Sequence, residues 1–246
     1  MVSLFNTFLY QPLFNALVFI YNTIAFSDIG LAIIFLTILI RLLLLPFSIK
    51  MTHSQKMLQN LQPKIEALKI QHKDDKEALS KEMMKLYREE HVNPFSSCLP
   101  LLIQLPFFFA IYQVFIDGLK KYQEVSESLL YSFVQNPGTI EPIAFGFLNL
   151  GERNIPLALA AGAAQYFQMK MLSQKKSPKN VETGAKDEDT LAAMNRNMQY
   201  TMPIVTVVIG ISFPGGLTLY WLITTIFSIL QQWIQFRPKE ESPSQQ

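Results

Sequence analysis

The sequence predicts an all-α membrane protein with five transmembrane helices, an N-terminal interfacial amphipathic helix and a cytoplasmic helical hairpin. Half of the 246 residues are hydrophobic and only 16% are charged, whereas a soluble domain carries about 25% charged residues. Long uncharged apolar runs alternate with segments rich in charge. Lysine and arginine are concentrated in alternate connecting segments, which is the pattern of a multi-pass membrane protein.

Five apolar segments are candidates to cross a bilayer core of about 30 Å. We place these spans at residues 28–50, 97–117, 154–172, 197–213 and 215–236. The last two come from one uncharged stretch that is too long for a single helix, and Pro214-Gly215-Gly216 divides it because proline and glycine interrupt helices. Spans three and four are short, and a locally thinned bilayer accommodates short spans.

The distribution of positive charge predicts the orientation. Nine lysines and arginines lie between the first two spans, six lie in or beside the loop 173–196, and two lie in the tail 237–246. The loop 118–153, on the opposite side, holds only Lys120, Lys121 and Arg153. Because positive residues accumulate on the cytoplasmic side, we expect a cytoplasmic C-terminus and an N-terminus outside.

The N-terminal segment 1–27 has no charged side chain before Asp28. Its polar residues share one helical arc and are Ser3, Thr7, Gln11, Asn15 and Asn22. This pattern predicts an uncharged amphipathic helix lying in the outer membrane interface, with a bend at Pro12. A sixth, atypical span is the alternative.

The segment 51–96 predicts an antiparallel helical hairpin in the cytosol. One apolar stripe consists of Leu58, Leu61, Ile65 and Leu68, and a second of Leu79, Met83 and Leu86. The sequence His-Lys-Asp-Asp between them supplies a turn and an aspartate N-cap. The hairpin is either a docking surface for partners or a solvated connection between spans. We expect the polar loop 173–196 to be mobile.

Arg41 is the unusual residue of the first span, because it lies near the middle of an apolar run. In a straight helix it would be about 12 Å from the cytoplasmic end, and a charge at this depth is costly. The only acidic residues of the five spans, Asp28 and Asp117, stand at span ends, so none lies beside Arg41 in the sequence to neutralise it. A hydrated cavity inside the membrane explains it best. The alternative is that Arg41 extends its side chain to the cytoplasmic headgroups.

Other polar side chains of the spans are candidates to line the same cavity. They are Thr37 and Ser48 on the helical face of Arg41, Gln104 in span two, Gln165 and Gln168 in span three, and Trp221, Thr225, Ser228 and Gln232 on one face of span five. Each glutamine alone could instead join neighbouring helices. Tyr220 and Trp221 could be interfacial aromatic residues.

The sequence shows no catalytic or cofactor-binding pattern. It has no P-loop, no Gly-x-Ser-x-Gly and no His-Glu-x-x-His motif. The three histidines do not have metal-ligand spacing, and the single Cys98 excludes a disulfide within the chain. A net charge of +2 does not indicate nucleic acid. We therefore expect no enzyme activity, no cofactor, no metal and no specific nucleic-acid partner.

Four sequence segments together resemble the YidC/Oxa-type membrane protein insertases. They are "GLAIIFLTILIRLLLLP", "LQPKIEAL", "NPFSSCLPLLIQLPFFFAIY" and "MPIVTVVIGISFPGGLTLYW", and the resemblance covers nearly the whole chain. It places the family's groove-lining positions at Arg41, Gln104, Tyr220 and Trp221. The implied fold is a minimal five-span core with a hydrophilic groove that is open to the cytosol and to lipid.

The resemblance implies that the chain inserts nascent membrane proteins into a bacterial plasma membrane and helps them to fold, without nucleotide hydrolysis. The implied partners are the nascent chains and the lipid bilayer, with the ribosome, the signal recognition machinery and the Sec translocon as further candidates. Three features depart from some relatives: a large extracytoplasmic domain and a lipobox cysteine are missing, and the tail is short. The alternative function is a small-molecule or anion transporter that uses Arg41 as its binding site.

Overall fold

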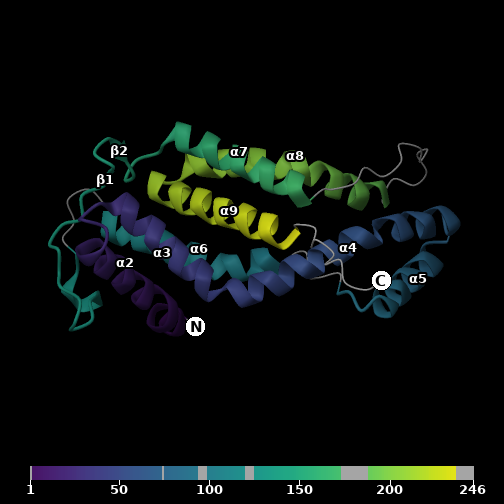
Figure 1. The fold of residues 1–246 in the computed structure, drawn as a ribbon, viewed down its shortest axis with the longest axis horizontal. Coiled ribbons are helices and arrows are strands. Elements are labelled where there is room, and N and C mark those ends of the chain that lie inside the picture. Colours follow the sequence, from purple (N-terminus) through teal and green to yellow (C-terminus); the bar gives the residue numbers. More distant parts are fainter. Residues whose placement is uncertain (1, 74, 94–98, 120–124, 173–187, 237–246) are drawn as a thin grey trace, which may run out of the picture.

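The computed structural model describes residues 2–73, 75–93, 99–119, 125–172 and 188–236. The chain forms an elongated helical bundle with a helical hairpin projecting from one end (Figure 1). The helices are α1 Val2–Phe5, the π-helical turn η1 Asn6–Tyr10, α2 Gln11–Thr23, α3 Ile29–Leu43, α4 Leu45–Gln71, α5 Lys76–Glu89, α6 Leu99–Leu119, the 3-10 turn η3 Glu127–Leu129, α7 Ile155–Leu172, α8 Glu188–Ser212 and α9 Gly215–Phe236. Two short antiparallel strands, β1 Ile143–Ala144 and β2 Leu148–Asn149, lie at the end opposite the hairpin.

The span predicted at 28–50 is not one continuous helix. Helix α3 ends at Leu43, α4 begins at Leu45, and the two helices are bent by 68° at this break. Pro46 lies in the first turn of α4, where its missing N–H leaves no helical hydrogen bond unmade. Helix α4 runs without interruption from Leu45 to Gln71, so no break in the helix marks the predicted boundary between span and hairpin at residue 51.

The hairpin consists of the distal part of α4 and of α5. Leu61, Ile65 and Val92 form its buried core, with partly buried side chains of both helices around them. Leu79 is also buried, whereas Leu68 is only partly covered. The side chain of Asp75 accepts a hydrogen bond of 2.9 Å from the backbone N–H of Ala78, so an aspartate caps α5 as the sequence indicates.

The N-terminal helix uses its polar arc differently from the prediction. Asn15 is 2% exposed, and both Gln11 and Asn15 donate hydrogen bonds to the backbone oxygen of Leu129. Asn22 donates to the backbone oxygen of Gln135 at 2.7 Å. The arc therefore contacts the loop at 125–140 through Gln11, Asn15 and Asn22, whereas Thr7 is exposed. The apolar side of α2 packs against α3, and η1 contacts α6.

The second half of the chain is a bundle of α7, α8 and α9, which lie side by side in Figure 1. Glycines permit the close contact of α7 and α8: a Cβ added at Gly162 would lie 2.3 Å from the Cγ2 of Val207. Helix α8 begins at Glu188, nine residues before the predicted span at 197–213. The predicted loop 173–196 is thus helical at its end, and residues 173–187 lie outside the described part.

Span five has the predicted bounds, Gly215–Phe236. The break before it is anchored to the segment that follows β2, because the backbone N–H groups of Gly215 and Gly216 donate to the oxygens of Glu152 and Leu150 at 2.7 and 2.9 Å. A side chain at Gly215 would lie 3.2 Å from the Glu152 oxygen. The absence of a Cβ at this position therefore allows α8 and α9 to reverse direction in a tight, buried turn.

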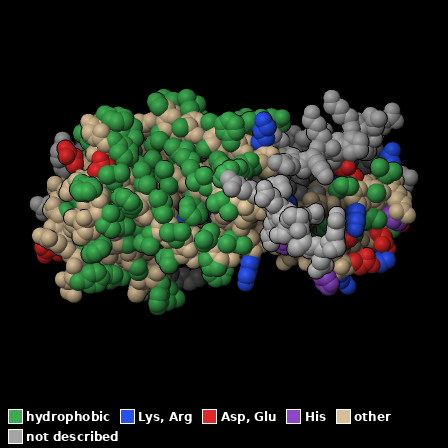
Figure 2. Space-filling model, viewed as in Figure 1, with side chains coloured by type: hydrophobic (Ala, Val, Ile, Leu, Met, Phe, Trp, Pro, Cys, Tyr) green, Lys and Arg blue, Asp and Glu red, His purple; other side chains and the backbone are tan. Residues whose placement is uncertain are grey.

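The surface separates by polarity along the long axis (Figure 2). Hydrophobic side chains cover the helical bundle, and charged side chains gather over the α4–α5 hairpin at one end, with a few at the other. Among the described residues, only α9 is a single helix long and apolar enough to cross a membrane, and the bent pair α3–α4 is a second candidate. Shorter apolar helical segments occupy Leu102–Ile116 and Tyr200–Ser212.

Candidate functional site: a polar face between α3, α6 and α9

Helix α9 carries the site on one of its faces. At 100° per residue, its polar side chains beyond Leu219 fall within an arc of about 140°; they are Tyr220, Thr224, Thr225, Ser228, Gln231, Gln232 and Gln235. The helix has no charged side chain. Polarity on a helix that is otherwise apolar predicts that this face meets polar groups of its neighbours, and the contacts of α9 with α3, α4 and α6 fit this expectation.

A chain of hydrogen bonds joins α3, α6 and α9 at the N-terminal end of this face. The guanidinium Nη2 of Arg41 donates to Oε1 of Gln104 at 3.5 Å, the upper limit of a hydrogen bond. The amide Nε2 of Gln104 donates to the hydroxyl of Tyr220, which is 3% exposed. Three residues that the sequence and the family resemblance singled out therefore meet.

Arg41 lies in the last turn of α3, so the 12 Å depth calculated for a straight span does not apply. This position stabilises the charge, because the carbonyl groups at a helix C-terminus carry partial negative charge. The side chain is partly buried and makes no ion pair with any described residue. Its guanidinium has five N–H donors, and a single long bond to Gln104 leaves most of them available to water or to a ligand.

A second contact joins α9 to α4, further toward the hairpin. The hydroxyl of Ser48 lies 2.9 Å from Oε1 of Gln231 and 2.9 Å from the Leu45 oxygen of its own helix. The Nζ of Lys56 lies 4.5 Å from the ring centroid of Phe236, a cation–π distance. The start of α4 thus lies along the same polar face of α9 as the end of α3.

The other hydroxyl groups predicted for the site bond within their own helices. Thr37 donates to the Ile33 oxygen at 2.6 Å, Thr225 to the Trp221 oxygen at 2.9 Å and Ser228 to the Thr224 oxygen at 3.0 Å. Each hydroxyl keeps acceptor capacity after donating its proton. These residues make the walls polar, but no hydrogen bond links them to Arg41.

Trp221 and Gln165 do not join the Arg41 chain. The ring of Trp221 packs edge-to-face on Phe108, with centroids 5.9 Å apart, and Phe108 packs in the same way on Phe213. Trp221 therefore fixes α9 against α6 and the end of α8. Gln165 is 9% exposed on α7, and its side chain makes no hydrogen bond to a described residue. The same holds for Gln168.

Three residues of the polar face were not predicted from the sequence: Thr224, Gln231 and Gln235. These three residues lie on the same side of α9 as Tyr220. The predicted face was centred on Trp221 and its helical neighbours, and Trp221 is rotated by 100° from Tyr220 about the helix axis. Within the described residues, the buried side-chain oxygens without a hydrogen-bond partner are those of Thr224, Gln232 and Gln235. All three belong to the polar face of α9, so this face has binding capacity that the protein itself does not use.

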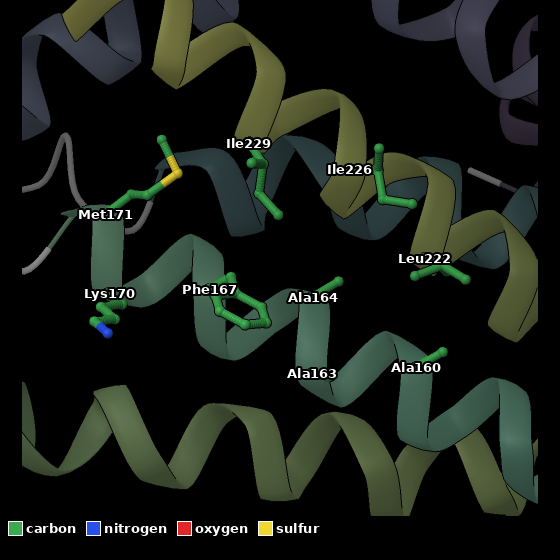
Figure 3. Close-up of a pocket in the computed structure, with 9 residues that line it drawn as sticks. All are labelled: Ala160, Ala163, Ala164, Phe167, Lys170, Met171, Leu222, Ile226 and Ile229. Carbon is green, nitrogen blue, oxygen red and sulfur yellow. The ribbon is translucent and has the colours of Figure 1, made fainter.

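An apolar groove lies on another side of α9. It measures about 900 Å³, and Ala160, Ala164 and Phe167 of α7 face Leu222, Ile226 and Ile229 of α9 across it (Figure 3). Lys170, its only charged lining residue, points away from α9 in this view. The two sides of α9 therefore differ in chemistry: one offers only hydrocarbon, the other hydrogen-bonding groups.

The polar face can bind polar groups but has no constellation for covalent chemistry. Its one permanently charged group is a guanidinium, and its other groups are hydroxyls and amides. No group of three or more His, Cys, Asp or Glu side chains that could hold a metal occurs among the described residues. The arrangement suits reversible contact with water or with a polar stretch of polypeptide.

The chain matches a known protein family and several named relatives. The model of the 60Kd inner membrane protein family matches residues 19–242. "Membrane protein insertase YidC" of Actinobacillus pleuropneumoniae is 33% identical over 95% of this chain, which spans 38% of that relative. The protein of the same name from Fusobacterium nucleatum is 32% identical, with 92% of this chain and 96% of the relative covered.

A solved structure has a similar fold. The chain matches the structure described as "Active YidC insertase crystal structure with the first transmembrane domain resolved" with a TM-score of 0.60 and 25% sequence identity. The match covers 94% of this chain and 47% of the other chain. This chain thus spans about two fifths to one half of its longer relatives and nearly all of the Fusobacterium relative.

Proposed function

Because this chain belongs to the YidC family of membrane protein insertases, we propose that it inserts nascent membrane proteins through a hydrophilic groove formed by the polar face of α9 and the facing sides of α3, α4 and α6. The groove opens to the cytosol and to lipid, and insertion proceeds without nucleotide hydrolysis. The anion-transporter alternative has no support from the relatives.

The observation that carries the proposal is the Arg41–Gln104–Tyr220 chain. It brings an unpaired cation and two neutral polar groups from three helices to one place within an apolar bundle. A buried charge without an ionic partner is strongly disfavoured in a dry interior. Water in the groove resolves this conflict, and the unpaired oxygens of α9 provide further sites for that water.

The groove lowers the barrier for the polar flank of a substrate. A transmembrane segment gains roughly 0.3–0.6 kcal/mol per large apolar residue on entering lipid, but its hydrophilic flank must cross a medium that cannot hydrogen-bond it. A hydrated groove that reaches part of the way shortens this path. Arg41 offers a partner to an acidic flank, and the membrane potential adds about 2.3 kcal/mol per charge for each 100 mV.

The topology that fits this mechanism has five spans, with the N-terminus outside and the C-terminus in the cytosol. The α4–α5 hairpin then stands in the cytosol, which agrees with the charged side chains gathered over it. The β1–β2 loop closes the outer end. We place the N-terminal helix at the outer interface, tied to the loop by its polar arc. The hairpin is the candidate contact for a ribosome or other targeting partner.

The test varies Arg41 and the charge of the substrate flank together. Purified protein in liposomes would receive single-span substrates that differ only in an acidic or neutral translocated flank. We expect Arg41→Lys to keep most activity. We expect Arg41→Ala to fold normally and to lose insertion of the acidic-flank substrate more than that of the neutral one, because charge pairs are strongest in low dielectric.

Two results would contradict this role. An equal loss for both substrates would mean that Arg41 hydrates the groove without attracting the flank. No loss for either substrate would make Arg41 a headgroup anchor. Chemical labelling of cysteines placed on α9 checks the geometry independently: access from the cytosol but never from outside is expected, whereas access from both sides would favour a transporter.

A further inference from the structure

The last two turns of α9 hold three glutamines whose surroundings differ. Gln231 is engaged, because its Oε1 accepts the hydroxyl of Ser48. Gln232 is 4% exposed, and its amide makes no hydrogen bond with a described residue. Gln235 is partly buried, and its Oε1 is shielded from solvent without a partner. The Oε1 atoms of Gln232 and Gln235, on one polar face, are therefore buried without a hydrogen-bond partner among the described residues.

Unpaired buried amides require an explanation, because native structures pair nearly all buried polar groups. An apolar residue at Gln232 or Gln235 would remove the cost, and the adjoining faces of α9 show that this helix tolerates leucine and isoleucine in every turn. The two amides also lie away from Arg41. Gln235 is fifteen residues beyond Tyr220, so it lies roughly 22 Å along the helix toward the hairpin end.

The chemistry of the amides defines what they can bind. A glutamine amide both donates and accepts hydrogen bonds, as a peptide group does, whereas Arg41 only donates. No charged side chain occurs on α9, and Lys56 of α4 lies over the ring of Phe236 at its end. A ligand at this place is therefore recognised by hydrogen bonds and not by its net charge.

We propose that Gln232 and Gln235 form a binding site for the extended peptide backbone of a substrate's hydrophilic flank, at the cytosolic entrance of the groove. The inference rests on the proposed function and adds a division of labour to it. The glutamines hold any flank irrespective of its side chains, and Arg41, deeper in the groove, distinguishes flanks by charge. This order suits an insertase, whose substrates differ in flank sequence but share a backbone.

The experiment uses flanks that differ in backbone donors. A Gly/Ser flank presents an N–H at every residue, a flank with proline at alternate positions lacks half of them, and a Gly/Ser flank with three aspartates tests charge. Insertion into liposomes would be compared for the wild-type chain, for Gln232→Leu with Gln235→Leu, and for Gln113→Leu. Gln113 is an exposed glutamine of α6, so it controls for the chemical change itself.

We expect the double variant to insert the Gly/Ser flank about tenfold more slowly, the effect of one to two net hydrogen bonds. The proline-rich flank should be slow in the wild type and should lose little more in the double variant. The ratio between acidic and neutral flanks should stay unchanged, because it depends on Arg41. A photo-crosslinker at position 235 should capture the flank of a stalled nascent chain, both for the Gly/Ser flank and for the Gly/Ser flank with three aspartates.

Three results would overturn the inference. Wild-type insertion by the double variant means that the amides bind nothing needed. An equal loss for the Gly/Ser and proline-rich flanks means that the glutamines only stabilise α9, and a missing crosslink at 235 in an inserting protein excludes contact. If the wild-type chain inserts no substrate, both the proposed function and the inference fail. If the wild-type chain inserts its substrates and one of the three results above is found, only the inference fails. The single Gln235→Leu variant guards against a folding defect, because its side chain is only partly buried.

Discussion

The substitution Asn15→Ala provides the sharpest test of how the N-terminal helix is held. The Nδ2 group of Asn15 donates to the backbone oxygens of Gln11 and Leu129, both at 2.8 Å, and its Oδ1 accepts from the N–H of Tyr131 at 2.7 Å. The side chain is 2% exposed. Alanine removes all three bonds and leaves the Tyr131 N–H without this acceptor.

The expected cost follows from these contacts. A net hydrogen bond contributes about 0.5–1.5 kcal/mol, and an orphaned buried donor costs about 1–3 kcal/mol. We therefore expect Asn15→Ala to lower the free energy of unfolding by about 2–4 kcal/mol. For a protein of this size, that corresponds to a fall in Tm of roughly 4–12 °C.

The assay is thermal unfolding of the purified protein in detergent, with two matched variants from the same polar arc. Asn22→Ala removes one exposed bond, to the Gln135 oxygen, and should cost about 1 kcal/mol or less. Thr7→Ala changes an exposed residue that makes no side-chain bond within the described part, and should be neutral. Equal Tm values for all three variants would refute the packing of the arc on the loop and restore a helix whose polar side faces the membrane surface.

Three further predictions concern other parts of the fold. Asp28→Ala should lower the free energy of unfolding by about 1–3 kcal/mol, because the carboxylate accepts from the N–H of Leu31 at the start of α3 and from the N–H of Phe145. Asp28→Asn should restore only part of it in the same melts, because its single amide oxygen can replace only one of the two carboxylate acceptors. Gly162→Val should cost about 1–3 kcal/mol by forcing α7 away from α8, whereas Ala163→Val, at an exposed position of α7, should not change Tm. Tyr220→Phe should leave the fold intact but release the Gln104 amide. Insertion of acidic-flank substrates should then fall, but less than in Arg41→Ala. An unchanged ratio of acidic-flank to neutral-flank insertion would show that this hydrogen bond does not position Arg41.

Much of the helical order could be predicted because it depends on local signals. The bounds of α9 follow from Pro214-Gly215-Gly216, and the α4–α5 turn follows from Asp75 as an N-cap. The bend at Leu44 could not be predicted, because Pro46 is compatible both with a kinked helix and with the start of a new one. Tertiary packing selects the second.

The site could be predicted only in part, for a related reason. Arg41 and Gln104 are conspicuous because they are polar within apolar runs. Periodicity alone does not say which face of α9 meets them, and a start at Trp221 instead of Tyr220 rotates the face away from Gln231 and Gln235. In the same way, the polar arc of the N-terminal helix shows that one side needs hydrogen bonds. It does not say that backbone oxygens at 129 and 135 provide them.

The unbroken course of α4 makes this helix a lever with unequal arms. Its 27 residues extend for about 40 Å from the bend at Leu44, and Ser48 lies only about 6 Å from that pivot. A tilt of about 5° would displace the hairpin tip by roughly 3–4 Å but Ser48 by about half an ångström. A displacement of that size is enough to weaken the 2.9 Å contact with Gln231. Large movements imposed on the hairpin therefore reach the contact between Ser48 and Gln231 as small adjustments of one hydrogen bond.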